Sequence, residues 1–272
     1  MRPEFFFDKE SHTYTLDGEV YPSVTTIISA TVPKNLAWWG MTTGIEGVCR
    51  LIELGYRFSV PPDRPEHIVK LLSEGGLTVN HQMKTAGVRG SAIHKALEKW
   101  GSEQEVPHLE DYPETTRPYI MGLANWLVEN EPEIREAEVR TGSVNFKYAG
   151  TFDLKVHFRK GKYKGRVVLI DLKTTKRVYP DQHFPQLEAY EQAEVESGEK
   201  PTDLRAVLHL GFEGKFGLAP SCDTFEDFAV LLKHYQSAEA RKQKLRDSGM
   251  RQDGMEKIKK SGRGEKYEPS VL

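Results

Sequence analysis

The segment VVLIDLK at residues 167–173 constrains the fold more than any other part of this sequence. Its first four residues are all apolar, which predicts a strand buried on at least one face of a sheet. Asp171 and Lys173 lie two positions apart, so their side chains share one face at a spacing of roughly 6–7 Å. A carboxylate and an ammonium at the end of a buried strand cost solvation energy, so their presence there indicates a functional role. The alternative is an ordinary surface ion pair, because a D-x-K triplet is common by chance.

A neighbouring strand is expected at 150–158, GTFDLKVHF. Strict alternation places its four apolar residues on one core-facing side and Asp153 on the other; the four are Phe152, Leu154, Val156 and Phe158. Gly150 would permit a bend or a close approach of another group to the backbone. A solvated Asp153 is the alternative interpretation, because single acidic residues in strands are usually exposed.

Two helices contribute further candidates. The helix expected at 184–197 places Gln186 and Tyr190 at i and i+4, on one face of one turn. The helix expected at 81–101 carries His94 between the apolar-stripe residues Gly90 and Leu97, so His94 is expected to face the sheet. Without further context, Gln186 fits a solvated position, Tyr190 a core position and His94 an ordinary boundary position.

The expected order of elements is mixed α/β, with helices first. A β-hairpin is expected over 4–21 with its turn at Asp17-Gly18, followed by a short helix capped by Ser23. The remaining expected elements are helices at 36–54, 67–72, 81–101, 115–130, 184–197 and 224–246, and strands at 136–146, 149–158, 166–173 and 204–211. We divide the chain into an N-terminal hairpin and helices packed on the core (1–80), a core (81–236) and a basic helix end with a flexible tail (237–272).

Taken in chain order, these pieces resemble the PD-(D/E)XK nuclease superfamily, and in particular the phage-encoded single-domain members of its RecB-type branch. That family shows G-x(3)-H, G-x-x-D, (D/E)-x-K and Q-x(3)-Y. This chain has Gly90–His94, Gly150–Asp153, Asp171–Lys173 and Gln186–Tyr190 in the same order. The likeness covers roughly residues 85–210. It implies a restriction-endonuclease-like core, a mixed central sheet flanked by helices, with the hairpin and N-terminal helices as an elaboration.

The resemblance also implies a site. Asp153 and Asp171 are hard oxygen ligands suited to Mg²⁺ or Mn²⁺, and His94 would add an imidazole. The backbone carbonyl of Leu172 is implied as a further ligand, and Lys173 would hold or deprotonate the attacking water. Gln186 and Tyr190 would position DNA or brace Lys173. Some relatives carry four cysteines for an iron–sulfur cluster; Cys49 and Cys222 alone do not supply that, so no cluster is expected.

The net charge of −2 conceals two opposed segments. Residues 155–177 hold nine basic residues and one acid, a net +8, whereas residues 101–138 hold ten acids and two basic residues, a net −8. A basic strip beside the site would attract phosphate groups. The expected nucleic-acid contacts are Lys155, Arg159, Lys176 and Arg177. A solvated hairpin turn is the alternative interpretation of this strip.

We therefore expect a divalent-metal-dependent deoxyribonuclease, more readily an exonuclease of phage-type recombination, replication or repair than a structure-specific endonuclease. The alternatives are a catalytically inactive nucleic-acid-binding module of the same fold and an interaction protein that uses its acidic segment. Double-stranded ends or single strands of DNA are the expected partner, with a recombination or replication protein as a possible second one. The start MRPEFFFDKE resembles no signal peptide and no run suits a membrane span, so a soluble, cytoplasmic protein without a membrane partner is expected.

Overall fold

A mixed five-stranded sheet forms the centre of the molecule. The computed structural model describes residues 2–8, 13–33, 36–58, 65–103, 105 and 107–248. The strands lie in the order β4-β5-β6-β7-β8. Their bounds are β4 (Pro132–Ser143), β5 (Tyr148–Phe158), β6 (Val167–Lys173), β7 (Leu204–Leu210) and β8 (Phe216–Pro220). Only the β6–β7 pair in this sheet is parallel, and helix α6 (Pro180–Glu196) connects these two strands.

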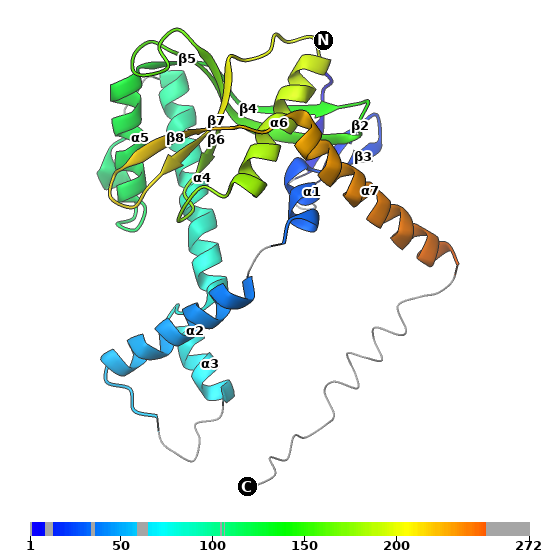
Figure 1. The fold of residues 1–272 in the computed structure, drawn as a ribbon. Helices are drawn as coiled ribbons and strands as arrows, with labels where there is room; N and C mark the ends of the chain where they lie inside the picture. Colours follow the sequence, from blue (N-terminus) through cyan, green and yellow to red (C-terminus); the bar gives the residue numbers. More distant parts are fainter. Residues whose placement is uncertain are drawn as a thin grey trace.

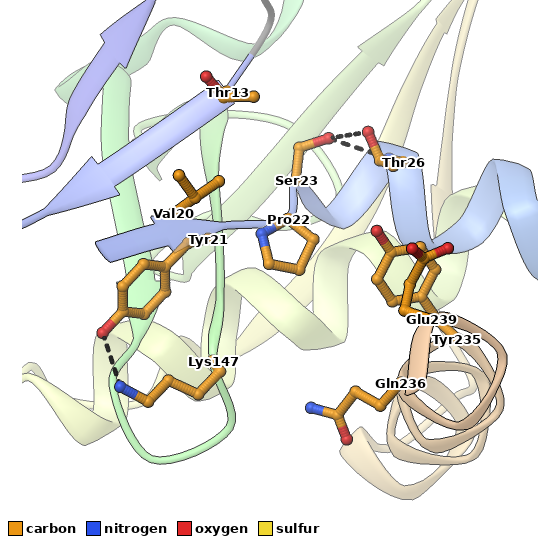
Figure 2. A pocket seen from close by; sticks show the side chains of 10 residues that line it. All are labelled: Thr13, Val20, Tyr21, Pro22, Ser23, Thr26, Lys147, Tyr235, Gln236 and Glu239. Atoms are coloured by element: carbon orange, nitrogen blue, oxygen red, sulfur yellow. Dashed lines mark hydrogen bonds between the residues drawn. The ribbon is translucent and has the colours of Figure 1, made fainter. Parts of the chain in front are cut away.

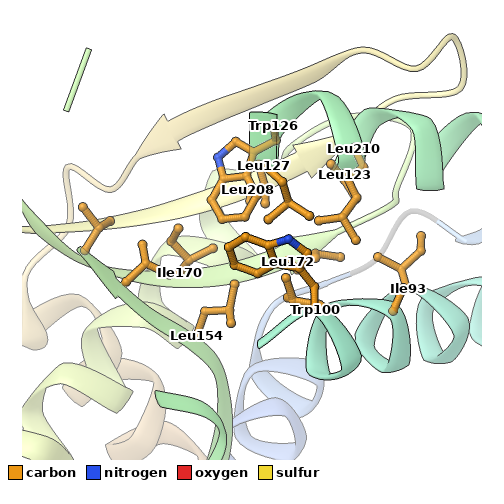
Figure 3. Packing of buried hydrophobic residues seen from close by; sticks show 14 of the residues in the cluster. Ile93, Trp100, Leu123, Trp126, Leu127, Leu154, Ile170, Leu172, Leu208 and Leu210 are labelled. Carbon is orange, nitrogen blue, oxygen red and sulfur yellow. The ribbon is translucent and has the colours of Figure 1, made fainter. Parts of the chain in front are cut away.

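Helices cover both faces of this sheet (Figure 1). On one face, α4 (Val79–Glu103) and α5 (Arg117–Asn130) bury Ile93, Leu97 and Trp126 against apolar side chains of β5, β6 and β7. Figure 3 shows this cluster, with Trp100 of α4 packed beside Leu154 and Leu172. On the other face, α6, α7 (Phe225–Asp247) and α1 (Val24–Thr31) enclose a second apolar cluster. The sheet is therefore buried on both sides, which confirms the prediction, from the apolar start of β6, of burial on at least one face.

The N-terminal hairpin is present with one additional strand. β1 (Phe6–Asp8), β2 (Thr13–Leu16) and β3 (Glu19–Tyr21) form an antiparallel sheet. The predicted turn is confirmed, since Asp17 and Gly18 have φ values of 52° and 80°. Ser23 caps α1 as predicted, because its side chain accepts a hydrogen bond from the Thr26 backbone N–H at 3.0 Å.

Two further helices extend away from the sheet as an arm (Figure 1). α2 (Leu36–Glu53) and α3 (Pro65–Glu74) pack on each other, and α2 also packs on α4. The segment 1–80 is thus divided in its contacts: the hairpin and α1 pack on the core, whereas α2 packs on α3 and α4. α4 starts at Val79, close to the expected boundary at residue 80.

The predicted elements are confirmed with boundary shifts of a few residues, and the short 3₁₀ segment η1 (Leu109–Asp111) lies before α5. One strand, β8, is not predicted by the sequence patterns, because this five-residue edge strand has Gly217 inside and Pro220 at its end, both unfavourable in strands. The predicted flexible tail beyond residue 248 lies outside the described residues. The coarse fold class is confirmed: an α/β protein with a mixed sheet flanked by helices and a second, antiparallel three-stranded sheet. Among the described helices, none combines the length and apolar character required to cross a membrane.

Candidate metal centre

Three side chains from three elements converge at one edge of the core. His94 of α4, Glu138 of β4 and Asp153 of β5 each offer a ligand atom, and these atoms lie within 4.8 Å of one another. His94 Nδ1 is 2.6 Å from Glu138 Oε1 and 3.8 Å from Asp153 Oδ1. Two carboxylates and an imidazole at this spacing form a donor set suited to a divalent cation.

An irregularity in β4 and β5 brings the two carboxylates to the α4 side of the sheet. Along β4, Ala137 packs in the α4–α5 cluster, and the next residue, Glu138, also contacts α4 through His94. Glu138 has a φ of 52°, in the left-handed region that non-glycine residues rarely adopt. The same change occurs on β5, where consecutive residues Asp153 and Leu154 both face α4. Such backbone strain is typical of functional sites.

This irregularity makes one prediction wrong. Strict alternation placed Phe152 on the same face as Leu154, Val156 and Phe158. Phe152 instead packs in the α1–α6–α7 cluster, and the other three pack in the α4–α5 cluster. The alternation rule requires regular strand geometry, and β5 departs from it at the position of Asp153.

Asp153 also connects β5 to β6. Its Oδ2 accepts a hydrogen bond from the backbone N–H of Leu172 at 2.6 Å. The described pairing of β5 with β6 runs from His157–Val167 to Leu154–Ile170, so this side-chain bond lies just beyond the paired region. The two strands separate there, and the carboxylate occupies the position between them.

Asp171 and Lys173 lie beside this group. Lys173 Nζ is 2.7 Å from Asp171 Oδ2, and Asp171 is only 1% exposed. Among the described residues, Lys173 is the one cation in contact with Asp171 Oδ2, and Asp171 Oδ1 has no hydrogen-bond donor. Buried carboxylate oxygens without donors are costly, and a bound cation would satisfy them. The residues present therefore fit a divalent metal.

Gln186 and Tyr190 lie on the α6 side of the same region. Gln186 Nε2 donates a hydrogen bond to the Tyr190 hydroxyl at 3.1 Å, and both side chains are buried. Burial and the charge of Asp171 raise the pKa of Tyr190 well above its ordinary value. Gly150 of β5 permits this arrangement, because a Cβ at that position would lie 2.5 Å from Tyr190 Cε1. The predicted close approach at Gly150 is confirmed.

The charges of the group shift its proton affinities. Burial raises the pKa of Asp153, and the nearby charge of Asp171 raises it further, to about 7. Burial lowers the pKa of His94, but the hydrogen bond with Glu138 and the charges of Asp153, Glu138 and Asp171 outweigh it and raise the value to about 9. Burial likewise opposes the charge of Lys173, whereas Asp171 and Asp153 raise its pKa above the ordinary value.

Glu138 is not predicted as a ligand by the sequence patterns. This residue lies in the segment treated as an acidic connector, near the start of a strand expected only from about residue 136. Its partner His94 is 44 positions away in sequence. An alternating E-x-E pattern at 136–138 was the one available signal, and it does not separate a ligand from a solvated strand residue.

Lys155 is not a surface residue, which corrects its expected contact with nucleic acid. It is 7% exposed, and its Nζ lies 2.7 Å from Glu136 and 2.8 Å from Glu194. Arg2 binds the same two carboxylates, at 2.8 and 2.5 Å. The Lys155 ammonium is therefore paired with carboxylates in an ion network that connects Arg2 to β4, β5 and α6, and it does not face solvent.

The predicted basic strip is also divided by the fold. Arg159 follows the far end of β5, roughly 20 Å from Asp153 by strand rise, and its guanidinium contacts Glu133. Lys176 and Arg177 are exposed in the loop that follows β6, a few residues from Lys173. Only this loop, among the expected contacts, combines exposure with proximity to the carboxylates.

A groove elsewhere on the protein is separate from the metal centre. It has a volume of about 580 Å³ and lies between the hairpin, the start of α1 and α7 (Figure 2). Tyr21, Ser23, Lys147 and Tyr235 are among its lining residues, and Lys147 donates a hydrogen bond of 3.2 Å to the Tyr21 hydroxyl. None of the candidate metal ligands lines this groove.

Comparison with known proteins does not assign the chain to a family. No family model matches it, and no curated protein matches it. One similar solved structure is described as the crystal structure of SSO0001, with a TM-score of 0.27 and 14% sequence identity. The likeness covers 52% of this chain and 67% of that one. At this level it carries no argument about fold or function.

Proposed function

We propose that this chain is a divalent-metal-dependent nuclease that hydrolyses phosphodiester bonds of DNA, with a restriction-endonuclease-like fold of the PD-(D/E)XK, RecB-type kind. The observation that carries the proposal is the convergence of His94, Glu138 and Asp153 within 4.8 Å, beside the buried Asp171–Lys173 pair. The motifs that resemble the family thus meet at one place. The sheet order, with β6 and β7 parallel and connected by α6, is compatible with such a core.

Each residue has a role in this proposal. A Mg²⁺ or Mn²⁺ ion would neutralise phosphate charge and lower the pKa of a water molecule. Asp153, Asp171, His94 and Glu138 would hold the ion, and the backbone carbonyl of Leu172 is a further candidate ligand. Lys173 would offset the charge that develops on the phosphate oxygens and orient the attacking water. Gln186 and Tyr190 hold each other and shape the α6 side of the site.

An exonuclease remains our preferred form of this activity, acting on DNA ends in recombination, replication or repair. Lys176 and Arg177 would bind the phosphate backbone next to the scissile bond. A structure-specific endonuclease and an inactive binding module use the same fold, so the experiment must separate all three.

The test is incubation of end-labelled linear DNA and covalently closed circular DNA with Mn²⁺ or Mg²⁺. We expect degradation of the linear DNA alone, no reaction with EDTA, and no reaction for Asp171→Asn or Lys173→Ala. Nicking of the circles would indicate an endonuclease. A mobility shift without cleavage would indicate a binding module and would contradict the proposal, as would wild-type cleavage by either variant.

Metal binding is a second readout that does not depend on cleavage. Calorimetric titration with Mn²⁺ should show one or more sites that weaken clearly in His94→Ala. A matched control is His157→Ala, because His157 lies on β5 four residues from Asp153 and contacts Glu133 instead. Equal affinities for the wild type and His94→Ala would remove His94 from the ligand set.

A further inference from the structure

An exposed arginine, Arg140, lies beside the candidate metal centre on β4. It follows Glu138 by two residues, a separation of roughly 6–7 Å along a strand. Its cross-strand partner on β5 is Thr151, which precedes Asp153 by two residues. Side chains of such directly opposed residues are neighbours, with Cβ atoms roughly 4.5–5.5 Å apart. Arg140 and Thr151 therefore border the two carboxylates on β4 and β5.

Arg140 and Thr151 point to the same side of the sheet as those carboxylates. Val139 and Phe152, the adjacent cross-strand pair, pack in the α1–α6–α7 cluster. Strand side chains alternate between faces, so Arg140 and Thr151 point to the opposite face, which is the α4 side. The hairpin reaches this side as well, because the Tyr14 hydroxyl of β2 and Thr151 Oγ1 form a hydrogen bond of 2.9 Å.

The Tyr14–Thr151 hydroxyl pair offers a hydrogen-bond donor beside Arg140. Burial raises the pKa of Tyr14 above its ordinary value, and the hydrogen bond with Thr151 lowers it. The charge of Arg140 also lowers this pKa and that of Glu138 raises it, so the phenol lies close to both. In a pair of hydroxyls one donates and the other accepts, so the accepting hydroxyl keeps its own hydrogen for another partner. Among the described residues, neither hydroxyl has such a partner.

Other basic side chains around the site are already engaged. Lys173 and Lys155 are paired with carboxylates. Arg89 of α4 donates two hydrogen bonds to Thr174, of 3.3 and 3.1 Å. Within the part of the chain that the structure describes, the side chain of Arg140 has no ion-pair or hydrogen-bond partner. A ligand can therefore bind its guanidinium without breaking a contact of the folded protein.

The position of Arg140 complements the loop that follows β6. Lys176 and Arg177 of that loop lie on the β6 side of the carboxylates and Arg140 lies on the β4 side, since β5 separates the two strands in the sheet. β4 and β6 run in the same direction, because both are antiparallel to β5, so the three cations belong to the same end of the sheet. Phosphates of a strand that crosses this end would meet positive charge on both sides of the metal centre.

We propose that Arg140, with a hydroxyl donor of the Tyr14–Thr151 pair, binds a phosphate group of the DNA next to the scissile one. This inference rests on the proposed nuclease function. The planar guanidinium binds two phosphate oxygens at once, and the hydroxyl supplies a further donor. This contact fixes the position of the DNA strand relative to the metal centre.

Fluorescence anisotropy with a labelled DNA duplex in EDTA measures this contact without cleavage. We expect Arg140→Gln to bind at least ~10-fold more weakly at low salt, with a slope of log affinity against log salt reduced by about 1. Arg140→Lys should keep the slope, because it keeps the charge, but should bind more weakly than the wild type because the bidentate contact is lost. Equal affinity and slope for Arg140→Gln and the wild type would overturn the proposal, as would a wild type that does not bind DNA.

The matched control is Arg135→Gln. Arg135 is exposed on the same strand, roughly 16 Å from Arg140 by strand rise, and lies away from the carboxylates. This variant should bind DNA like the wild type, and thermal melting should show that both variants are folded. An equal loss of affinity in Arg135→Gln would overturn a specific site at Arg140, because it would indicate a general effect of positive charge.

A cleavage assay with Mn²⁺ separates this contact from the metal centre. Arg140→Gln should raise KM for DNA more than it lowers kcat, and its calorimetric affinity for Mn²⁺ should equal that of the wild type. Cleavage without any effect of Arg140→Gln would refute the phosphate site and leave the nuclease intact. DNA binding that depends on Arg140, in a wild type that does not cleave, would refute the nuclease and leave the phosphate site.

Two further comparisons define the ligand and the donors. An equal effect of Arg140→Gln on duplexes with 5′-phosphate, 3′-phosphate and hydroxyl ends indicates an internal phosphodiester, and an effect confined to one phosphorylated end indicates a terminal phosphate; both outcomes support the site. Tyr14→Phe combined with Thr151→Val removes both hydroxyls and should weaken binding, whereas each single variant leaves one donor and should not. Normal binding by the double variant would overturn the role of the hydroxyl pair.

Discussion

The backbone N–H of Leu172 donates a hydrogen bond of 2.6 Å to Oδ2 of Asp153. One carboxylate thus has two tasks, since its Oδ1 faces His94 and its Oδ2 satisfies the backbone of β6 just beyond its paired region with β5. Asp153 therefore has a structural role and a role in the proposed chemistry, and substitutions at this position can separate the two roles.

We expect Asp153→Asn to lose metal binding and cleavage while the metal-free protein stays at least as stable as the wild type. The amide oxygen can accept the Leu172 bond, and the neutral side chain removes repulsion between the buried carboxylates of Asp153 and Asp171. Asp153→Ala should be less stable than Asp153→Asn by about 1–3 kcal/mol, because the Leu172 N–H loses its acceptor. Urea denaturation in EDTA measures both; equal stability of the two variants would count against this role of the bond.

Glu138→Gly should weaken Mn²⁺ binding at least ~10-fold. Its free energy of unfolding should remain within about 1 kcal/mol of the wild type, because two effects oppose each other. Glycine adopts the positive φ of position 138 without strain, but it loses more conformational entropy on folding than glutamate does. Glu133→Gln, an exposed site on the same strand, is the control and should bind Mn²⁺ normally. Unchanged Mn²⁺ affinity in Glu138→Gly would exclude Glu138 as a ligand.

The two glycines of the family-like motifs should respond in opposite ways to alanine. Gly150→Ala forces a methyl group against the Tyr190 ring and should cost about 1–3 kcal/mol, with loss of cleavage. Gly90 lies inside α4 with no atom within 4 Å of an added Cβ, so Gly90→Ala should stabilise by roughly 0.5–1 kcal/mol. Thermal melting of both variants tests the contrast, and destabilisation by Gly90→Ala would show that the helix needs glycine there.

Substitution of Lys176 and Arg177 by alanine should reduce the slope of log affinity for DNA against log salt by about 2, because two phosphate contacts are lost. Arg159→Ala should change this slope little, since its guanidinium contacts Glu133 at the far end of β5. Fluorescence anisotropy with a catalytically inactive background measures both. A larger effect at Arg159 would place the DNA on the other end of the sheet.

Glu136 should make stability depend on pH in the acid range. Burial raises its pKa, but the hydrogen bonds and charges of Arg2 and Lys155 outweigh that effect and lower it below the ordinary 4.5. Its contribution is therefore present above pH 4.5 and is lost as the pH falls through the lower folded-state value. Glu136→Gln should cost roughly 1–3 kcal/mol at pH 7. This difference should shrink below pH 4.5 in denaturation measurements; a difference independent of pH would contradict the ionic role.

The sequence alone predicted every α-helix and strand of the core except β8 and, through the resemblance, four of the residues around the candidate centre. The apolar start of β6, the turn at Asp17-Gly18 and the cap at Ser23 depend on local preferences, so their patterns are readable without tertiary contacts. Asp153, Asp171, Lys173 and His94 are predicted as site residues by the resemblance of their motifs to the nuclease family rather than by strand period, because the regular alternation of β5 does not hold at Asp153.

Only the tertiary structure decided the roles of Glu138 and Lys155. Both are charged residues on strands, and neither position shows in sequence which partner it meets. Glu138 faces His94 because its backbone adopts a left-handed conformation, whereas Lys155 is buried between Glu136 and Glu194. Partners 39 and 44 positions away determine these environments. Local sequence indicates the face to which a side chain points when the strand is regular. The irregular backbone at Glu138 and the charged partners of both residues arise only when distant segments pack together.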